Sequence, residues 1–239
     1  MISGTILIIG GTSGIGFEVA KKAIEEGAKV VVVSSNQDKV DSAVAELGAS
    51  ASGAVADLEN GDPEAALKPV FEKHAFNHVI LTAEKRPEFR KLADIDVDYI
   101  RRTYRLKVEV GLIVAKLVQK YLPEDYKSSY IMTGGSATDK PVPGWSVASG
   151  ATAALTGLVK ALALDLAPRR VNVVAPGAVD TPLWGEKTPE VQAMLSHIGE
   201  SLPLKKVATS AEVAEAYLYL LKDTNATASI VNTNGGGLL

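Results

Sequence analysis

Short apolar runs alternate with longer helical patterns along this chain. Five runs are rich in β-branched residues and apolar at successive positions, so both of their faces are apolar: TILIIG (5–10), KVVVVS (29–34), HVILT (78–82), SYIMT (129–133) and VNVVA (171–175). Strands of this kind are typical of buried parallel sheets. Two weaker runs, at 52–57 and 228–232, bring the expected set to about seven strands.

The helical patterns between these runs have readable ends. Asp62 precedes Pro63, an N-cap residue followed by proline at the first helical position, and Thr209 and Glu212 have the spacing of a capping box. The longest helical patterns cover 96–122 and 145–167. Strands that alternate with helices predict βαβ crossovers, and therefore an α/β protein with a doubly wound parallel sheet between two layers of helices. We expect a single domain over 1–239, with its ligand at the carboxyl ends of the strands.

A glycine-rich turn follows the first predicted strand. Gly10, Gly14 and Gly16 lie between that strand and a helix, and the next strand follows the helix. Glycines at such a turn let the backbone approach a pyrophosphate, while the helix N-terminus presents free N–H groups to the anion. The ordered set of strand, turn, helix and strand predicts a dinucleotide site in a Rossmann-type fold.

The glycine spacing, Gly-x-x-x-Gly-x-Gly, resembles that of the short-chain dehydrogenase/reductase family, and the resemblance extends over nearly the whole chain. Asp57 stands at the family's adenine-contacting position, and TAE (82–84) stands in place of its Asn-Ala-Gly. APGAVDT (175–181) matches its Pro-Gly-x-x-x-Thr, and a Gly-Gly pair occurs at 235–236. The motifs imply these cofactor-binding residues: Gly10, Thr12, Ser13, Gly14, Ile15, Gly16, Asp57, Leu58, Thr82, Ala83, Pro176, Gly177, Val179 and Thr181.

The end of the second strand bears on the choice of cofactor. An acidic residue there would accept hydrogen bonds from the ribose of NAD and repel a 2′-phosphate. Instead the chain has Ser34, Ser35 and Asn36, with Lys39 one helical turn further on, which favours NADPH and NADP+. The same residues also suit a helix N-cap, and the two interpretations are compatible.

The acid–base residues that the resemblance implies are missing. The family has a Tyr-x-x-x-Lys pair at the start of a long helix, and Ala148 and Thr152 occupy those positions here. The family's upstream Ser falls on Gly135 or, with a shift of one residue, on Ser136. An Asn of the preceding helix appears as Lys107, and Glu84 replaces a glycine usually close to the cofactor.

The reduction of a ketone needs a proton as well as a hydride, whereas a preformed iminium needs the hydride alone. We therefore expect reduction of an imine, an iminium or a similar activated acceptor. A small group of fungal reductases of indole-alkaloid biosynthesis also lacks the catalytic residues and has a Pro-Asp-Pro-Gly-Trp stretch. The chain is similar in having Pro141, Pro143, Gly144 and Trp145, but Val142 replaces the Asp. The resemblance implies secondary metabolism and a templated cyclisation such as an intramolecular Diels–Alder reaction. The alternatives are a non-redox cyclase or isomerase on this scaffold and a catalytically silent NADPH-binding protein.

Three residues are candidates for the remaining chemistry. Lys107 is expected to supply a proton or anchor an anionic group, unless it is a surface lysine. Trp145 is expected to stack on a polycyclic or cationic substrate, or else to pack the entrance of its helix. Ser136 is either a remaining hydrogen-bond donor or a loop hydroxyl. The segment 179–204 lies where the family has its mobile substrate lid.

Composition narrows the partners. The formal net charge is only −3, which gives no reason to expect nucleic acid or an anionic membrane, so a small-molecule substrate is the expected partner. The sequence has no cysteine, and its three histidines lack ligand spacing, so we expect no metal. MISGTILIIGG lacks the basic segment and the length of a signal peptide, which predicts a cytoplasmic protein. The resemblance implies a homodimer or homotetramer built from the helices at 96–122 and 145–167.

Overall fold

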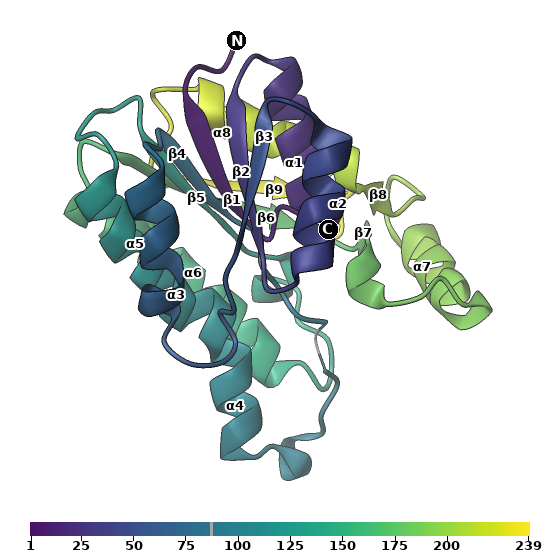
Figure 1. The fold of residues 1–239 in the computed structure, drawn as a ribbon. Helices are drawn as coiled ribbons and strands as arrows, with labels where there is room; N and C mark the ends of the chain where they lie inside the picture. The colour runs from purple at the N-terminus through teal and green to yellow at the C-terminus, as the bar shows by residue number, and fades with distance from the viewer. Residues whose placement is uncertain (87) are drawn as a thin grey trace.

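A parallel sheet forms the centre of the molecule in a computed structural model that describes residues 1–86 and 88–239 (Figure 1). Within these residues the sheet has seven strands in the order β3-β2-β1-β4-β5-β6-β9. The strands are β1 (Thr5–Ile9), β2 (Lys29–Ser34), β3 (Ala51–Val55), β4 (His78–Leu81), β5 (Ser129–Thr133), β6 (Arg170–Pro176) and β9 (Ile230–Thr233). Every neighbouring pair is parallel, so all seven carboxyl ends meet at one edge.

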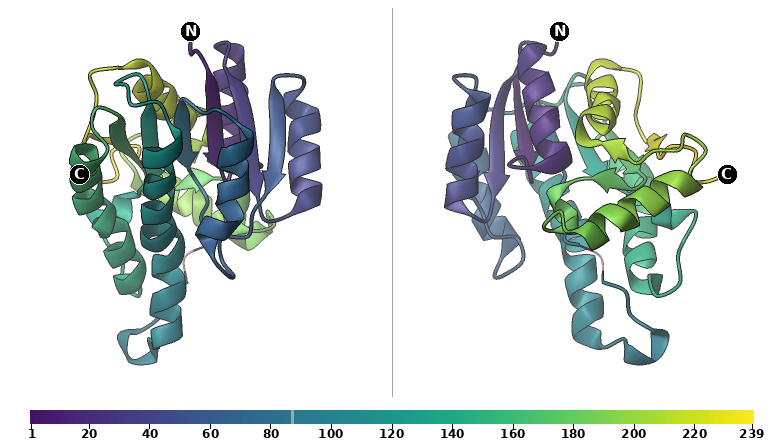
Figure 2. Two further views of the ribbon diagram at one scale, coloured as in Figure 1. Left: turned by 60° about the vertical axis from the view of Figure 1, so that its left-hand side comes forward. Right: turned by 90° about the vertical axis from the view of Figure 1, so that its right-hand side faces the viewer.

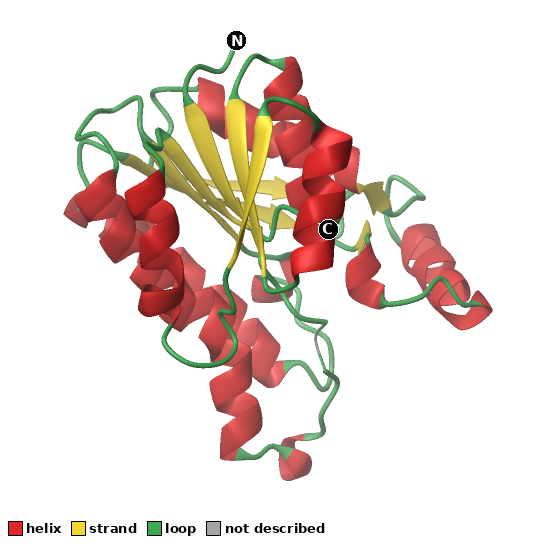
Figure 3. Cartoon of the chain, viewed as in Figure 1, coloured by secondary structure: helices red, strands yellow, loops and turns green. Residues whose placement is uncertain are grey.

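Helices cover both faces of this sheet, as Figure 2 and the secondary-structure colouring of Figure 3 show. One layer contains α1 (Gly14–Glu25), α2 (Gln37–Leu47) and α8 (Ser210–Lys222). The opposite layer contains α3 (Pro63–Lys73), α5 (Val110–Tyr121) and α6 (Ser146–Asp165). Side chains alternate along β1, so that Ile6 and Ile8 join the first layer while Leu7 and Ile9 join the second. The predicted three-layer α/β/α fold and its seven strands are confirmed.

Both predicted helix starts are confirmed. The Asp62 carboxylate accepts hydrogen bonds from the backbone N–H groups of Glu64 (2.8 Å) and Ala65 (3.3 Å) at the start of α3. At the start of α8, Thr209 and Glu212 form a complete capping box. Caps of this kind satisfy N–H groups that have no partner within the helix, and they fix where each crossover begins.

The pattern at 96–122 does not form one continuous helix, contrary to the expectation. It comprises α4 (Val97–Tyr104), a π-helical turn over Arg105–Glu109, and α5. The Arg105 guanidinium donates to the carbonyls of Leu58 and Gly61, which ties this turn to the loop after β3. A π turn inserts one residue without changing which residues are apolar, so the 3.6-residue periodicity does not reveal it. The segment α4 projects beyond the sheet in Figure 1.

Two short strands, β7 (Val179–Asp180) and β8 (Ala208–Thr209), pair outside the main sheet, and the sequence did not predict them. They flank α7 (Pro189–Ser201), which projects from the body of the molecule (Figure 1). Among the described residues, α6 is the one helix long and apolar enough to cross a membrane by length and hydropathy. Core helices meet the same criterion, and α6 contributes Leu155 and Val159 to the core beside the sheet.

Candidate active site

The glycine turn after β1 is a close-packed junction between three segments. Gly10 has φ +91°, and a Cβ there would lie 2.5 Å from the backbone nitrogen of Ala83. A Cβ at Gly16 would lie 2.5 Å from Thr82 Oγ1, and one at Gly14 would lie 3.4 Å from Thr181 Cγ2. Only glycine fits at Gly10 and Gly16 without moving neighbouring backbone, which is the arrangement that a pyrophosphate cradle needs.

The N-terminus of α1 opens onto this turn. Ser13 is the N-cap residue in an extended conformation, and its side chain makes no capping hydrogen bond within the described residues. The first N–H groups of α1 therefore point out of the helix with no side chain to satisfy them, as an anion site requires. Thr12 lies in the turn, and Ile15 lies in the first turn of α1 and packs partly against the core on this side of the sheet.

The other predicted cofactor residues gather along the same edge of the sheet. Thr82 and Ala83 follow β4, where both backbone N–H groups donate to the carbonyl of Ile9 at 2.8 and 3.0 Å. Pro176 ends β6, Val179 begins β7, and Thr181 lies beside Gly14. A Cβ at Gly177 would lie 3.0 Å from Asn234 Cα, which places this loop against the segment after β9. The fold thus brings the predicted pyrophosphate and nicotinamide segments together.

At the adenosine end of the predicted site, the same residues cap α2 and offer polar groups to a cofactor. Asn36 is the N-cap of α2 and its side chain accepts from the Lys39 N–H at 2.9 Å, so the capping interpretation is confirmed. Ser34 ends β2, and the exposed Ser35 follows it. Lys39 is exposed in the first turn of α2, where the positive end of the helix dipole favours an anion.

Asp57 lies in the turn after β3. Hydrogen bonds from the Asn60 side chain and from the backbone N–H groups of Glu59 and Asn60 hold the pKa of its carboxyl below the ordinary value. The carboxylate therefore stays ionised and fixed in its turn. Leu58 is buried in the core, and its carbonyl accepts a hydrogen bond from Arg105 at 3.0 Å.

The three positions that would hold the family's acid–base residues are adjacent. A Cβ at Gly135 would lie 3.6 Å from Thr152 Cγ2, and Thr152 lies one helical turn after Ala148 on α6. The Thr152 hydroxyl donates to the Ala148 carbonyl at 2.8 Å, and the residue is only 7% exposed. The Thr152 hydroxyl proton is therefore engaged in a hydrogen bond within α6. Ser136, the alternative serine, is half-buried and begins a short 3-10 turn over Ser136–Thr138.

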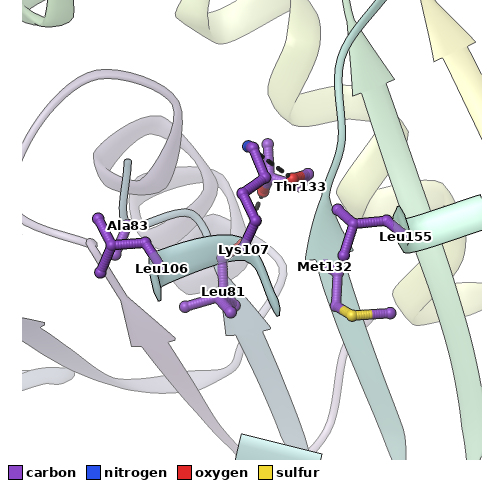
Figure 4. A pocket seen from close by; sticks show the side chains of 7 residues that line it. All are labelled: Leu81, Ala83, Leu106, Lys107, Met132, Thr133 and Leu155. Atoms are coloured by element: carbon purple, nitrogen blue, oxygen red, sulfur yellow. Dashed lines mark hydrogen bonds between the residues drawn. The ribbon is translucent and has the colours of Figure 1, made fainter. Parts of the chain in front are cut away.

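The surroundings of Lys107 favour a role inside the molecule over the surface-lysine interpretation, because little of its side chain is exposed. Its side chain is 12% exposed, its Nζ donates to the Thr133 carbonyl at 3.1 Å, and it forms an ion pair with the Glu84 carboxylate. A small cavity adjoins this ammonium, as Figure 4 shows, lined by Leu81, Ala83, Leu106, Lys107, Met132, Thr133 and Leu155. The Thr133 hydroxyl donates to the Leu81 carbonyl at 2.7 Å and shares a hydrogen bond with the Tyr217 hydroxyl, which fixes the end of β5.

Trp145 stands at the N-cap of α6 and contacts a residue that the sequence did not single out. Its ring lies 5.1 Å from that of Phe89 at 42°, and Phe89 is 64% exposed. The neighbouring Gly144 carbonyl accepts from the Arg90 N–H at 3.0 Å. Within the described part of the chain, the buried indole N–H of Trp145 and the Ser149 hydroxyl have no hydrogen-bond partner. Trp145 therefore packs at the start of α6, beside the exposed ring of Phe89.

Sequence reasoning missed the contacts that join these segments. The Glu84–Lys107 pair, the Phe89–Trp145 contact and a hydrogen bond from Arg86 to the Trp184 carbonyl (3.1 Å) all involve the segment after β4. One signal was present in the sequence, because Glu84 and Lys107 replace two uncharged family residues with opposite charges. Their distance in sequence concealed the pairing.

The fold and the glycine turn agree with a family model described as an SDR-like rossmann domain, which matches residues 1–239. The chain therefore belongs to the short-chain dehydrogenase/reductase family of oxidoreductases.

Among its relatives, the chain is 35% identical over 248 residues to the short-chain dehydrogenase/reductase malC of Malbranchea aurantiaca, covering 98% of this chain and 94% of that protein. It is also 35% identical over 249 residues to fsr5 of Gibberella fujikuroi, covering 98% of this chain and 94% of that protein. The solved structure of the MalC Reductase/Diels-Alderase from M. aurantiaca superposes with a TM-score of 0.93 at 34% identity, over 99% of this chain and 96% of that chain. A small-chain dehydrogenase in complex with NADPH superposes with a TM-score of 0.82 at 27% identity, over 100% and 99% of the two chains.

Proposed function

We propose that this protein is an NADPH-dependent reductase of an activated acceptor, an imine or iminium, in secondary metabolism. The observation that carries the proposal is the presence of the close glycine turn together with three adjacent positions without acid–base groups, Gly135, Ala148 and Thr152. The residues that would bind the hydride donor are therefore present in this chain. The residues that would deliver a proton are replaced.

The described residues fit NADPH. Close packing at Gly10 and Gly16 fixes the turn before α1, and the free N–H groups at the N-terminus of α1 suit a pyrophosphate. Ser34, Ser35 and Lys39 offer hydroxyls and a cation to a 2′-phosphate. NADPH bound there would supply a hydride at the carboxyl ends of β4 and β5. The NADPH complex of a structural neighbour supports this choice of cofactor.

The absence of the proton relay favours one kind of hydride acceptor over another. Hydride addition to a ketone forms a basic alkoxide, and general-acid catalysis of that step contributes about 10²–10⁴-fold in rate. The residues at the family's Tyr and Lys positions cannot supply it, because Ala148 has no titratable group and the Thr152 hydroxyl is bound to a backbone carbonyl. Hydride addition to an iminium forms a neutral amine and needs no acid.

Stopped-flow oxidation of NADPH tests the proposal. We expect rapid oxidation with N-methyl dihydroisoquinolinium, a permanent cyclic iminium, and slow or no oxidation with the ketone tetralone, which has a similar shape. NADH in place of NADPH is the cofactor control and should give the weaker binding. Ketone reduction as fast as iminium reduction would contradict the proposal. Tight NADPH binding with no turnover of any acceptor would instead indicate a silent NADPH-binding protein.

A second candidate function, a templated cyclisation such as an intramolecular Diels–Alder reaction, has one specific observation in its favour. The relative from M. aurantiaca is described as a Reductase/Diels-Alderase, and here the Phe89–Trp145 pair presents an aromatic surface at the entrance of α6. We propose that a polycyclic substrate stacks on this pair and that the segment 179–204 is its lid. Cyclised product formed with NADP+ and no NADPH would show a cyclase or isomerase in which the cofactor is structural.

The same proposal extends to partners and location. We propose a small-molecule substrate, a homodimer or homotetramer assembled through the helices of 96–122 (α4 and α5) and 145–167 (α6), and a cytoplasmic location. Light scattering of the purified protein measures the assembly directly, and a monomeric mass would contradict it.

A further inference from the structure

The loop 57–61, which follows β3 and contains the predicted adenine-contacting residue Asp57, is held by a side chain from another part of the chain. Arg105 begins the π turn between α4 and α5. Its Nε donates to the Leu58 carbonyl at 3.0 Å, and its Nη2 donates to the Gly61 carbonyl. These acceptors lie 47 and 44 positions earlier in the sequence, so the guanidinium holds the loop from outside it.

Asp57 is fixed within this loop and retains capacity for a donor. Its Oδ1 accepts from the backbone N–H groups of Glu59 and Asn60 at 2.9 and 3.2 Å, and its Oδ2 accepts from the Asn60 side chain at 2.9 Å. An ionised carboxylate has about four acceptor positions, so the described contacts leave about one, on Oδ2. Because Asp57 is exposed, an amino group of a ligand can reach that oxygen.

A second contact from outside the loop is weaker. Lys85 forms an ion pair with Glu59, but their side chains are 55% and 39% exposed, and exposed ion pairs contribute little. The Arg105 side chain is 19% exposed and donates to two carbonyls at once, which the fork of a guanidinium allows and a lysine ammonium does not. Among the described contacts, Arg105 is therefore the stronger support of loop 57–61.

The Arg105 guanidinium is itself fixed. Its Nη1 pairs with the Glu109 carboxylate at the other end of the π turn, so each of its three nitrogens has an acceptor. Hydrogen bonds from Asn60 and from the Glu59 N–H, and to a lesser extent the charge of Arg105, hold the pKa of the Asp57 carboxyl below its ordinary value. The guanidinium thus acts on the loop through its carbonyls and on Asp57 through its charge.

We propose that Arg105 is a positioning residue that holds loop 57–61 so that the Asp57 carboxylate meets the amino group of the adenine of NADPH. The proposal rests on the cofactor of the proposed function and adds a residue that the family resemblance did not supply. Adenine has an exocyclic amino group that donates to a carboxylate, whereas hypoxanthine has a carbonyl oxygen at the same place, which a carboxylate repels. Discrimination between the two bases therefore reports the position of Asp57.

Loss of Arg105 should act on cofactor binding and not on turnover. Lys107, on the same π turn, has its own contacts with the Glu84 carboxylate and the Thr133 carbonyl. Arg105→Met is therefore expected to raise KM for NADPH about 10-fold and to change kcat at saturating NADPH less than about 2-fold. General loss of structure around the π turn would lower kcat as well.

The test measures binding of NADP+ and of nicotinamide hypoxanthine dinucleotide phosphate by calorimetry, with no acceptor present. The wild type is expected to bind NADP+ about 10-fold more tightly than the hypoxanthine analogue, the size of one charge-assisted hydrogen bond. Arg105→Met is expected to reduce this preference to less than about 2-fold, chiefly by weakening NADP+.

Three further variants locate the effect. Arg105→Lys keeps the charge but cannot span both carbonyls, so it should also lose most of the preference, and it tests the idea even if Arg105→Met is unstable. Lys85→Met is the matched control on the same loop and should keep the wild-type preference. Asp57→Asn should lose the preference, and the double variant D57N/R105M should lose no more than D57N alone, because Arg105 acts through Asp57.

The outcomes separate this inference from the proposed function. A wild-type preference retained in both Arg105 variants, or no preference in the wild type, overturns the inference whatever the enzyme reduces. Equal weakening of both dinucleotides by Arg105→Met, or a loss of preference as large in Lys85→Met, overturns it in favour of a general structural role. A preference that depends on Arg105, in an enzyme that oxidises NADPH with no acceptor tested, supports the inference and contradicts the reductase.

Discussion

His78 should make the stability of this protein fall steeply in mild acid. It begins β4, is 5% exposed, and shares a 2.9 Å hydrogen bond with the Ser129 hydroxyl on β5. Burial, and to a lesser extent the charge of Arg170, lowers the pKa of its imidazole from 6.5 to about 4. A charged imidazole has no favourable place there, because its surroundings are the apolar sheet and a cation.

The size and sign of the effect follow from this shift. Below pH 6.5 the unfolded chain binds a proton at His78 that the folded protein does not take up until about pH 4. The contribution of His78 to stability is therefore fully present above pH 6.5 and is lost as the pH falls toward 4. The whole shift corresponds to about 3 kcal/mol, and about 2.5 kcal/mol of it is lost between pH 7.5 and pH 4.5.

Urea unfolding at a series of pH values, followed by tryptophan fluorescence, measures this loss. The comparison is between the wild type and His78→Gln, whose side chain retains hydrogen-bonding groups but has no titratable proton. The variant is expected to be less stable at pH 7.5 and to lose about 2.5 kcal/mol less on acidification than the wild type. His197→Gln is the matched control because His197 is exposed on α7. Parallel acid dependence of the wild type and His78→Gln would refute the reasoning.

Three other substitutions test the site and its supports. Gly16→Ala places a methyl group 2.5 Å from Thr82 Oγ1 and should weaken NADPH binding about 10-fold or more by titration, whereas Gly157→Ala, where a Cβ meets no heavy atom within 4 Å, should leave it unchanged. Arg86→Ala removes the hydrogen bond to the Trp184 carbonyl and should raise KM for the acceptor several-fold without changing the Kd of NADPH; a change in both would indicate wider disruption. Thr209→Ala breaks the capping box of α8 and should cost about 1 kcal/mol in urea unfolding, and a cost near zero would contradict a stabilising cap.

The fold could be predicted because its signals are local. Five runs apolar on both faces and two weaker runs predicted the seven strands, and N-cap residues such as Asp62 and Thr209 marked helix starts without any tertiary information. The π turn at 105–109 and the β7–β8 pair depend on long-range hydrogen bonds, from Arg105 to Leu58 in the first case and between strands in the second. Neither leaves a periodic pattern in the sequence, so neither was predicted.

One part of the candidate site could also be predicted from the sequence, and another part could not. The glycine turn could be predicted because its spacing is set by backbone geometry, and the structure places Gly10, Gly16 and Thr82 in mutual contact. The environment of Lys107 could not be predicted, since a lysine on an amphipathic helix is ordinarily exposed. It lies on the π turn with little of its side chain exposed, and Glu84, 23 positions earlier, supplies the partner charge.

The charges of Lys107 and Glu84 support one another at this place. The Lys107 ammonium contacts the Glu84 carboxylate and the Thr133 carbonyl, so removal of either charged partner leaves the other without its ion pair. The Ala148 and Thr152 side chains leave this part of α6 without a charge, so the Glu84–Lys107 pair supplies the charges described near it. Under the proposed function, we expect a site organised in this way to discriminate acceptors by charge and shape. We expect no advantage for a ketone, whose reduction depends on a proton that Ala148 and Thr152 do not deliver.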